Sequence, residues 1–527
     1  MSHSTVRRIV LAAVVIAAAA QFVRPDRTNP PVITEQAFET GGRVPAQVVA
    51  TVKRGCYDCH SNTTIWPWYT NVSPISWMVA DHVTEGRQKL NFSQWNALPA
   101  NRQIKKLEDI QRLVAKGEMP LSSYLLLHQD AKLSSADKEI VTNWASTERA
   151  RLQQEQALAA MPPFAPVSTH GGFVYVSGIL PGPTIAPASA TDDIRSQTTR
   201  VLNELSARLT QAGTSLDRVV TLSVYLKRAE DFAAMNQIWA KYWPADPPSR
   251  TTVVAGLPRP GALLQVSAVA AAAGTPRQTV HPRAWLKSPS PYSYAVKSGD
   301  TLFLAGLVAR RGADNSTVKG DIVVQTRTAL ENAKAILAEA GFGFNDVVSA
   351  RVFLTDVANF ARMNETYRSA WANDPPARAT VITGLTNPDY LVEITFVAVK
   401  GGTRVAYTTP SAPGSAAAPN PNLSGAIGHG PRLFVSGMLG IVPGKPPDAA
   451  EQTREILARL GRTMSLGGAK WSQVIDSVVY VTDLGKAPAV LDAFRAQVGP
   501  SLPVGTLVVS GLVSPAGLAE IMLTTGK

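Results

Sequence analysis

Cysteine is scarce in this sequence: its 527 residues contain only two, Cys56 and Cys59. A structural zinc site needs further ligands, and no second cysteine pair exists to supply them. A redox-active pair of the thioredoxin type would not need the histidine that follows at position 60, and it would lie in a βαβ context that is missing here. The scarcity therefore argues against both kinds of site.

Charged residues are also few, at 17% of the chain, although 51 Lys and Arg against 39 Asp and Glu leave a net charge of +12. No long basic run or aromatic–basic stripe is present that would follow a phosphate backbone. We therefore expect no nucleic-acid partner. The excess charge suits solubility, with attraction to an anionic membrane surface or an acidic redox partner protein.

Long apolar runs are absent except at the N-terminus. Arg7 and Arg8 precede an unbroken apolar run over residues 9–20, and polar residues 24–27 follow soon after. This is the layout of an export signal. The run is short for a membrane span, and the alanines at 18–20 suit cleavage. Residues 1–25 are thus predicted to be a signal peptide or, over residues 9–23, an inner-membrane anchor of a periplasmic protein.

Both cysteines fall in one motif, Cys56-Tyr57-Asp58-Cys59-His60. Two thiols at this spacing reach the two vinyl groups of a haem, and the adjacent histidine is placed to donate an imidazole nitrogen to the iron. The motif predicts one covalently attached haem c, with His60 as an iron ligand, and therefore electron transfer with a redox partner protein.

A second iron ligand must come from elsewhere. Met119 is our first choice because the Gly117 and Pro120 around it favour a loop that presents the thioether. His128 and His82 are the alternatives. Methionine ligation would give a higher potential than two histidines would.

Residues 26–155 resemble the haem-binding domain family of bacterial exported proteins. The resemblance is carried by the residues around 24–31, the motif at 56–61, Trp66-Pro67-Trp68-Tyr69, Asn91-Phe92-Ser93 and Glu118-Met119-Pro120. It implies a mostly helical haem domain whose apolar N-terminus is retained as an anchor.

The remainder of the chain contains an internal repeat. The segments 249–257, 377–385 and 504–512 align without gaps and place Gly256, Gly384 and Gly511 in the same position. Three domains of one fold are therefore expected.

Each repeat has the predicted order β, α, β, α, β, β. In the second repeat, for example, helices are expected at 326–340 and 360–371, and strands at 347–354, 379–383 and 392–399. A sheet covered by helices on one face needs cover on the other. We predict that three copies provide it by closing into a pseudo-threefold ring. Three independent beads are the alternative. Residues 162–166, 274–291 and 401–422 are predicted to be surface linkers.

The three repeats, over 164–273, 290–401 and 423–527, are each similar to the RidA/YjgF family. The resemblance implies an α+β, chorismate-mutase-like fold and trimers that hydrolyse reactive enamines and imines in clefts between subunits. It agrees with an intrachain pseudo-trimer that binds a small carboxylate or imine.

The family's site residues map best onto the second repeat. By resemblance, Arg378 would hold the substrate carboxylate, Glu393 would position water, Tyr292 is the tyrosine of the Pro-Tyr-Ser motif, and Asn364 is the asparagine of the second helix. Arginine suits a carboxylate because its guanidinium is a bidentate fork.

The outer repeats have each lost part of this set. The first keeps Arg250 and Asn236 but has Gln265 and Phe164 in the glutamate and tyrosine positions. The third keeps Glu520 but has Gly505 and Leu491 for the arginine and asparagine. Clefts that draw on two neighbouring repeats could still be complete, but the sequence does not say which repeats meet.

Two hypotheses follow. In the first, an exported cytochrome carries a ring that hydrolyses or binds imines. In the second, the ring is a binding or assembly scaffold, and electron transfer by the haem is the only activity. A simpler interpretation of Arg378 and Glu393, an internal ion pair, also stays open at this point.

Overall fold

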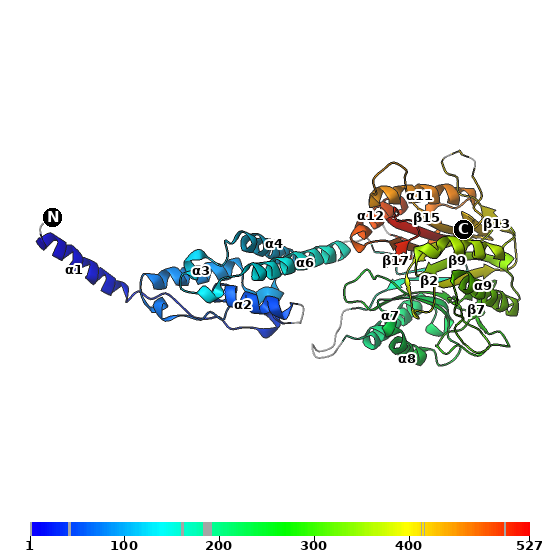
Figure 1. Ribbon diagram of the computed structural model, residues 1–527. Helices are drawn as coiled ribbons and strands as arrows, with labels where there is room; N and C mark the ends of the chain where they lie inside the picture. Colours follow the sequence, from blue (N-terminus) through cyan, green and yellow to red (C-terminus); the bar gives the residue numbers. More distant parts are fainter. Residues whose placement is uncertain are drawn as a thin grey trace. The chain divides into compact units, whose positions relative to one another are not determined.

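A computed structural model describes residues 3–40, 44–159, 163–182, 192–412, 414–415, 417–499 and 502–526 (Figure 1). Met1, Ser2 and Pro162, which belong to the predicted signal and first linker, lie outside these residues. The chain forms two compact units, Met1–Gln156 and Ala157–Lys527, and each is described by itself.

The N-terminal unit is helical, as predicted. Its α-helices are α1 (His3–Ala20), α2 (Ala46–His60), α3 (Ile75–Lys89), α4 (Ala100–Lys116), α5 (Ser122–Leu125) and α6 (Ser135–Ala159). Within the described residues, none of the helices, α1 included, has the length and apolar character that crossing a membrane requires.

An aromatic cluster forms the core of this unit. The ring of Phe38 meets the edges of Phe92, Trp95 and Trp144, with ring centroids 4.9, 5.8 and 5.2 Å apart. Such edge-on contacts add to the stabilisation that burial provides. Helices α2 and α3 also approach each other closely at Gly86. A Cβ at this position would lie 2.4 Å from the carbonyl oxygen of Cys59, so no side chain fits there.

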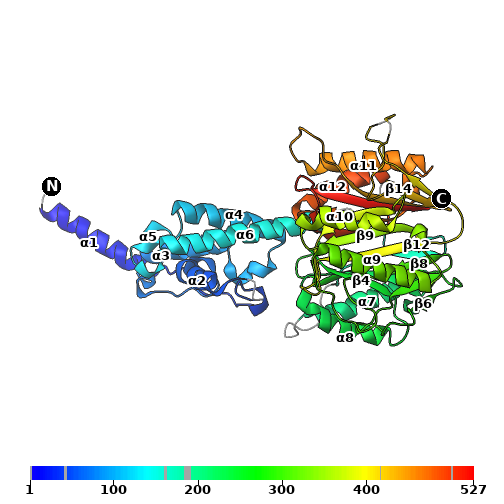
Figure 2. The same ribbon diagram turned by 45° about the vertical axis from the view of Figure 1, so that its right-hand side comes forward.

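The second unit contains three sheets with helices on their outer faces (Figures 1 and 2). The first repeat contains β1 (Val167–His170), β2 (Phe173–Ile179), α7 (Ile194–Gln211), β3 (Val219–Leu226), α8 (Phe232–Tyr242), β4 (Ser249–Val254) and β5 (Leu264–Ala271).

The second and third repeats continue this order. The second contains β6 (Gln278–Val280), β7 (Ala295–Ser298), β8 (Thr301–Leu304), α9 (Ile322–Glu339), β9 (Val347–Leu354), α10 (Phe360–Tyr367), β10 (Ala377–Ile382), β11 (Gly384–Leu385) and β12 (Val392–Val399). The third contains β13 (Arg404–Tyr407), β14 (Ala426–His429), β15 (Arg432–Leu439), α11 (Ala449–Leu466), β16 (Val474–Val481), α12 (Ala487–Val498), β17 (Gly505–Val509), β18 (Gly511–Leu512) and β19 (Ala519–Gly526).

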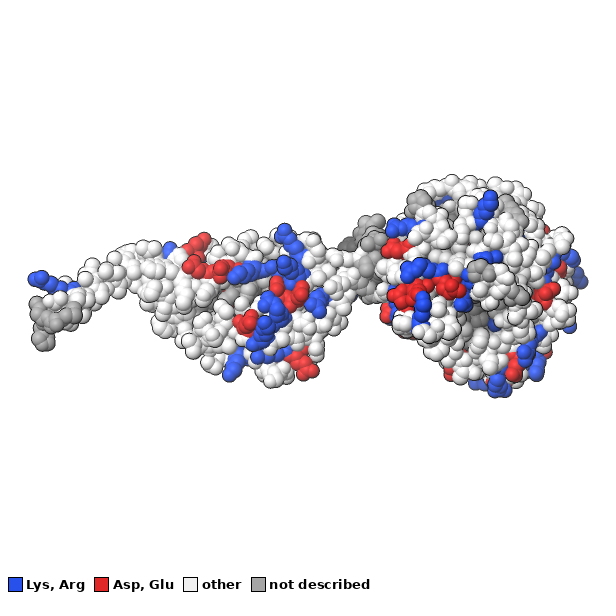
Figure 3. All heavy atoms as spheres, turned by 90° about the horizontal axis from the view of Figure 1, so that it is seen from above, with Lys and Arg blue, Asp and Glu red and all other residues white. Residues whose placement is uncertain are grey.

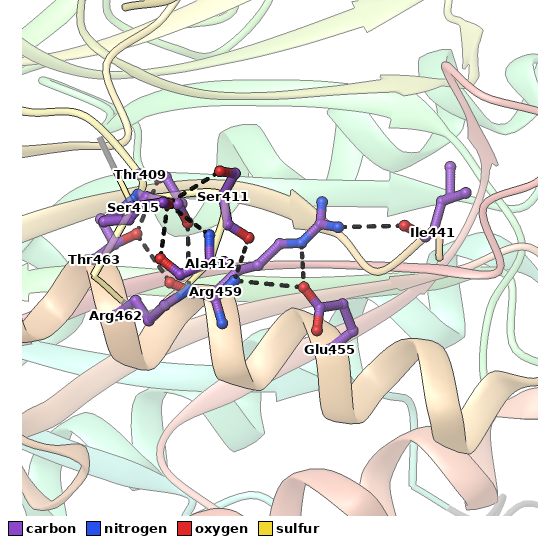
Figure 4. Close-up of polar contacts among 10 residues, drawn as sticks. Thr409, Ser411, Ala412, Ser415, Ile441, Glu455, Arg459, Arg462 and Thr463 are labelled. Atoms are coloured by element: carbon purple, nitrogen blue, oxygen red, sulfur yellow. Dashed lines mark hydrogen bonds and ion pairs between the residues drawn. The ribbon is translucent and has the colours of Figure 1, made fainter. Parts of the chain in front are cut away.

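The segments predicted as linkers do more than connect repeats. Strand β6 lies within residues 274–291 and pairs with β7, and β13 lies within 401–422 and pairs with β14. The residues that follow β13 are also fixed on α11, where Arg462 donates to the carbonyl oxygens of Pro410 and Ser411 (Figure 4). The prediction of plain surface linkers is therefore wrong for these stretches, because their backbones extend the sheets.

The three repeats close into a ring. Strand β11 of the second repeat pairs with β4 of the first, β18 of the third pairs with β10 of the second, and Gly256 of the first bridges to Val509 of the third. Side chains from all three sheets, including Tyr225, Phe353 and Tyr480, share one buried cluster. The predicted pseudo-threefold ring is confirmed.

On the face drawn in Figure 3, Lys and Arg lie beside Asp and Glu, and neither sign forms a continuous stripe over the residues described there.

Candidate functional site

A first group of site residues, called cleft 1 after the clefts that the resemblance implies, lies where the first and second repeats meet. Strand β4 supplies Arg250, and helix α8 supplies Asn236, whose Oδ1 accepts a hydrogen bond of 2.7 Å from Arg250 Nη2. The second repeat supplies Glu393 from β12 and Tyr292, whose ring centroid lies 5.7 Å from the guanidinium carbon of Arg250. The Thr252 N–H donates to Glu393 Oε1 at 3.2 Å.

The guanidinium in cleft 1 has unused hydrogen-bonding capacity. Arg250 is 3% exposed, and its Nε and Nη1 atoms have no hydrogen-bond partner. Burying donors without partners costs free energy, so they indicate a missing acceptor. Two free donors on one guanidinium suit a carboxylate.

The carboxyl group of Glu393 is largely neutral at pH 7. Burial raises its pKa to about 8, although the Thr252 N–H and the positive charge of Arg250 both lower it. A carboxyl group with its pKa in this range can take or give a proton near neutral pH. Cleft 1 can therefore hold a carboxylate and orient a water molecule beside it.

Gly306 makes room for this carboxyl group. A Cβ at this position would lie 1.8 Å from Glu393 Oε1, so no side chain fits. The N–H of Gly306 also donates to the carbonyl oxygen of Arg250 at 3.1 Å, which joins the two repeats at the cleft.

A second cleft, cleft 2, repeats this arrangement between the second and third repeats. Arg378 Nη2 donates to Asn364 Oδ1 at 2.8 Å, its Nε and Nη1 lack partners, and its guanidinium carbon lies 4.7 Å from the ring centroid of Tyr367. The acid is Glu520, which accepts from the Thr380 N–H; burial raises its pKa to about 8.

The structure separates two residues that the sequence placed in one site. Arg378 is in cleft 2, whereas Glu393 and Tyr292 are in cleft 1 with Arg250. Among the described residues, Arg378 and Glu393 form no ion pair with each other or with any other group, so the internal ion pair is also wrong. Each cleft takes its arginine from one repeat and its glutamate from the next.

A third position, cleft 3, between the third and first repeats, has no chemistry of this kind. Gly505 and Leu491 replace the arginine and asparagine, and Gln265 replaces the acid. The ring of Phe164 fills the space: a Cβ on Gly505 would lie 2.6 Å from it. The losses that the sequence showed at these positions of the outer repeats meet in this one cleft, so clefts 1 and 2 each keep an arginine, an asparagine and a glutamate.

A separate cavity of about 390 Å³ lies in the N-terminal unit. Cys56, Cys59, His60 and Met119 all line it. His60 Nδ1 lies 2.9 Å from the carbonyl oxygen of Gly86 and 3.0 Å from that of Leu90. Carbonyl oxygens only accept, so Nδ1 carries the proton and Nε2 is left with a free lone pair. Burial lowers the pKa of His60, which keeps the ring neutral.

The two thiols are protonated. Burial raises the pKa of Cys56 to about 12 and that of Cys59 to about 11. A redox-active pair instead needs a lowered thiol pKa. In the part of the chain that the structure describes, no three His, Cys, Asp or Glu side chains are grouped to hold a metal ion. The cavity thus fits a haem, with two thiols and a metal-ligating imidazole, better than it fits zinc.

The candidates for the second iron ligand all line this cavity. His128 has both ring nitrogens engaged: Nε2 lies 3.0 Å from Tyr69 Oη and Nδ1 lies 3.1 Å from the carbonyl oxygen of Tyr124. Among the described residues, the side chains of His82 and Met119 form no hydrogen bond, and a thioether needs none. This arrangement favours Met119 or His82 over His128.

Several site residues were not found from the sequence. Gly306 and Gly437 are recognisable as repeat landmarks, but only the structure shows that each admits a glutamate. Trp239 and Tyr367 lie against the two arginines. In the sequence they look like core residues of the second helix of their repeats. Arg310, which donates to Tyr292 Oη, has no arginine at the equivalent position of the third repeat.

Comparison with known families agrees with both units. The family model for a haem-binding domain matches residues 15–147, and that for endoribonuclease L-PSP matches residues 154–272, 283–400 and 413–525.

Individual relatives match one repeat at a time. A RutC family protein of Pyrococcus horikoshii is 44% identical over 110 residues, which are 21% of this chain and 87% of the relative. The 3-aminoacrylate deaminase RutC of Acinetobacter baylyi is 36% identical over 123 residues, which are 23% of this chain and 98% of the relative. Among solved structures, a putative endoribonuclease from Thermotoga maritima is 35% identical, covers 24% of this chain and 98% of its own, and has a TM-score of 0.23.

Proposed function

Because this chain belongs to the endoribonuclease L-PSP family through three consecutive segments and carries a haem-binding domain before them, we propose that it is an imine or enamine hydrolase joined to a cytochrome. The same arrangement of residues supports the hydrolase at two places in the ring. A buried arginine with two unpaired donors faces a buried carboxyl group with a pKa of about 8 in each of clefts 1 and 2.

In this proposal the arginine binds the substrate carboxylate and fixes the imine carbon near the glutamate. The glutamate takes a proton from water as the water oxygen attacks that carbon, and the C=N bond becomes a single bond. The proton is then returned to the nitrogen, which gives a carbinolamine. The hydroxyl proton of this intermediate passes through the glutamate to the nitrogen, the C–N bond breaks as the C=O bond forms, and the products are ammonia and a 2-oxo acid. The name of the Acinetobacter baylyi relative supports this chemistry, because 3-aminoacrylate is an enamine that bears a carboxylate.

The test uses imines released by an amino-acid oxidase and follows the rate of 2-oxo acid formation. We expect the full-length protein to accelerate it. Glu393→Gln and Glu520→Gln should each abolish the activity of one cleft, and the double variant should abolish all acceleration. If the wild-type protein produces none, the hydrolase proposal fails. Tight binding of a 2-oxo acid near Arg378 without turnover would then favour the scaffold hypothesis.

For the N-terminal unit we propose one covalent haem c, attached through Cys56 and Cys59 and ligated by His60 and Met119. The free Nε2 of His60 and the two protonated thiols in one cavity support this assignment. A haem bound there would supply one-electron transfer to a redox partner protein. Gly86 and Leu90 hold the imidazole in the tautomer that this requires.

Covalent attachment of haem c takes place outside the cytoplasm, so we propose that residues 1–25 direct the protein to the periplasm, either as a signal peptide or, over residues 9–23, as an inner-membrane anchor. Protein from cells competent in cytochrome maturation should give a pyridine haemochrome spectrum of haem c and a mass raised by one haem. Cys56→Ser with Cys59→Ser should lose both signals. Colourless mature protein would contradict the proposal, and recovery of the haem protein from the cytoplasm would contradict the export.

A further inference from the structure

Clefts 1 and 2 share their arginine, asparagine and glutamate but differ in the residues beside them. In cleft 1, Arg310 Nη2 donates to the hydroxyl of Tyr292 at 2.6 Å. Arg310 is half-buried, and it forms no ion pair with any residue that the structure describes. It lies four residues after Gly306, whose N–H is bonded to the carbonyl oxygen of Arg250, so a short segment connects the two arginines.

The equivalent positions of cleft 2 are occupied by apolar residues. Asn332 of α9 donates to the carbonyl oxygen of Arg310 at 2.7 Å, and Arg459, at the same place on α11, donates to that of Ile441 at 3.2 Å (Figure 4). Ile441 is therefore the counterpart of Arg310.

The same reasoning pairs Tyr292 with Leu423. Each precedes a serine, Ser293 or Ser424, whose N–H donates to the carbonyl oxygen of the proline two residues before the cleft arginine, Pro248 or Pro376. Cleft 1 thus has a cation and a phenol beside it, and the equivalent positions at cleft 2 hold two aliphatic side chains.

We propose that the two clefts select different side chains on their 2-oxo or 2-imino acids. Cleft 1 takes dicarboxylic acids, with one carboxylate on Arg250 and the distal one on Arg310 and the Tyr292 hydroxyl. Cleft 2 takes acids with an aliphatic side chain, which contacts Leu423 and Ile441. For turnover, this selectivity rests on the proposed hydrolase function; for binding it does not.

The physical reason is the cost of burying a charge. A distal carboxylate in cleft 2 would lose water without gaining a cation, whereas in cleft 1 the guanidinium of Arg310, which forms no ion pair with a described residue, replaces that water. An aliphatic side chain in cleft 1 would instead cover the charge of Arg310 without offering a partner of opposite sign.

Binding of stable acids tests the selectivity independently of turnover. Arg378→Gln leaves only the anchor of cleft 1, and Arg250→Gln leaves only that of cleft 2. By titration calorimetry we expect the Arg378→Gln protein to bind 2-oxoglutarate about tenfold more tightly than 4-methyl-2-oxopentanoate, and the Arg250→Gln protein to show the opposite order. Adding Arg310→Leu to Arg378→Gln should bring the two dissociation constants together, whereas the neighbouring Arg311→Leu should leave their ratio as it was.

A gain-of-function variant gives a result that does not depend on removing a buried arginine. Ile441→Arg with Leu423→Tyr should raise the number of tight 2-oxoglutarate sites from one to two per chain. Any one of three results would overturn the inference. These are the same order of preference in both single-cleft proteins, an unchanged ratio of dissociation constants after Arg310→Leu, and no second tight site in the gain-of-function variant. Selective binding without hydrolysis would overturn the proposed function and leave this inference standing.

Discussion

The carboxyl groups of Glu393 and Glu520 should make the activity depend on pH. Burial raises the pKa of each to about 8, so the ionised form that accepts a proton from water is the minor form at pH 7. In a Glu520→Gln protein, we expect kcat/KM for imine hydrolysis to rise about tenfold per pH unit below 8 and to level off above it.

The matched Glu393→Gln protein should show the same rise, because Glu520 then carries the activity. The double variant should show no pH-dependent rate above the spontaneous hydrolysis. A profile that falls as the pH increases through 8 would contradict the role of the carboxylate as a base, since it would require the neutral acid.

Gly306 should be as important as the glutamate that it admits. In Gly306→Ala the new methyl group would overlap Glu393 Oε1, so the carboxyl group must move. A displacement of this size at a reacting group costs on the order of 100-fold in rate. We expect that loss in the Glu520→Gln background, where only cleft 1 is measured.

Gly437→Ala is the control, because its methyl group would meet Glu520 in cleft 2 instead. It should leave the activity of cleft 1 intact in the same background. Equal losses from the two substitutions would contradict the assignment of each glycine to its own cleft.

The sequence identified most of the site residues but not their grouping. Arg378 and Glu393 lie in one repeat and therefore look like one site. Ring closure decides otherwise, because Thr252 of the first repeat donates to Glu393 and Thr380 of the second donates to Glu520. These contacts join residues far apart in sequence, and no local pattern encodes them.

At the scale of helices and strands, the sequence was most accurate where hydrophobic alternation is strong. Strand β9 has the predicted bounds, Val347–Leu354, and β12 likewise spans Val392–Val399. Helix α9 begins at Ile322, four residues before the predicted start, because Asp321 accepts hydrogen bonds from the N–H groups of Val323 and Val324. Helix α10 ends at Tyr367, and a short 3₁₀ turn continues to Ala370.

Helix α9 should contribute to stability through its buried face. Ile336 is fully buried in the core of the second repeat, whereas Val324 on the same helix is 36% exposed. Ile336→Ala leaves a cavity, so we expect it to lower the free energy of unfolding by about 3 kcal/mol. Val324→Ala should change it by about 0.5 kcal/mol or less. Urea unfolding followed by circular dichroism measures both, and similar effects of the two would contradict the packing of this helix.

At the scale of the whole molecule, one chain contains every interface of the ring. Each sheet is paired at its edge with a neighbouring repeat, and the inner faces share one buried cluster. We therefore expect the full-length protein to have the mass of a single chain in light scattering. A mass of three chains would show that the repeats pair between molecules instead, as separate subunits would.

The loss of cleft 3, where Phe164 lies against Gly505, has a consequence for how such a protein can evolve. In a trimer of identical subunits, each mutation changes all three active sites at once. When the three copies are joined in one gene, each copy can mutate separately. One cleft can then keep only a structural role while the other two specialise for different metabolites.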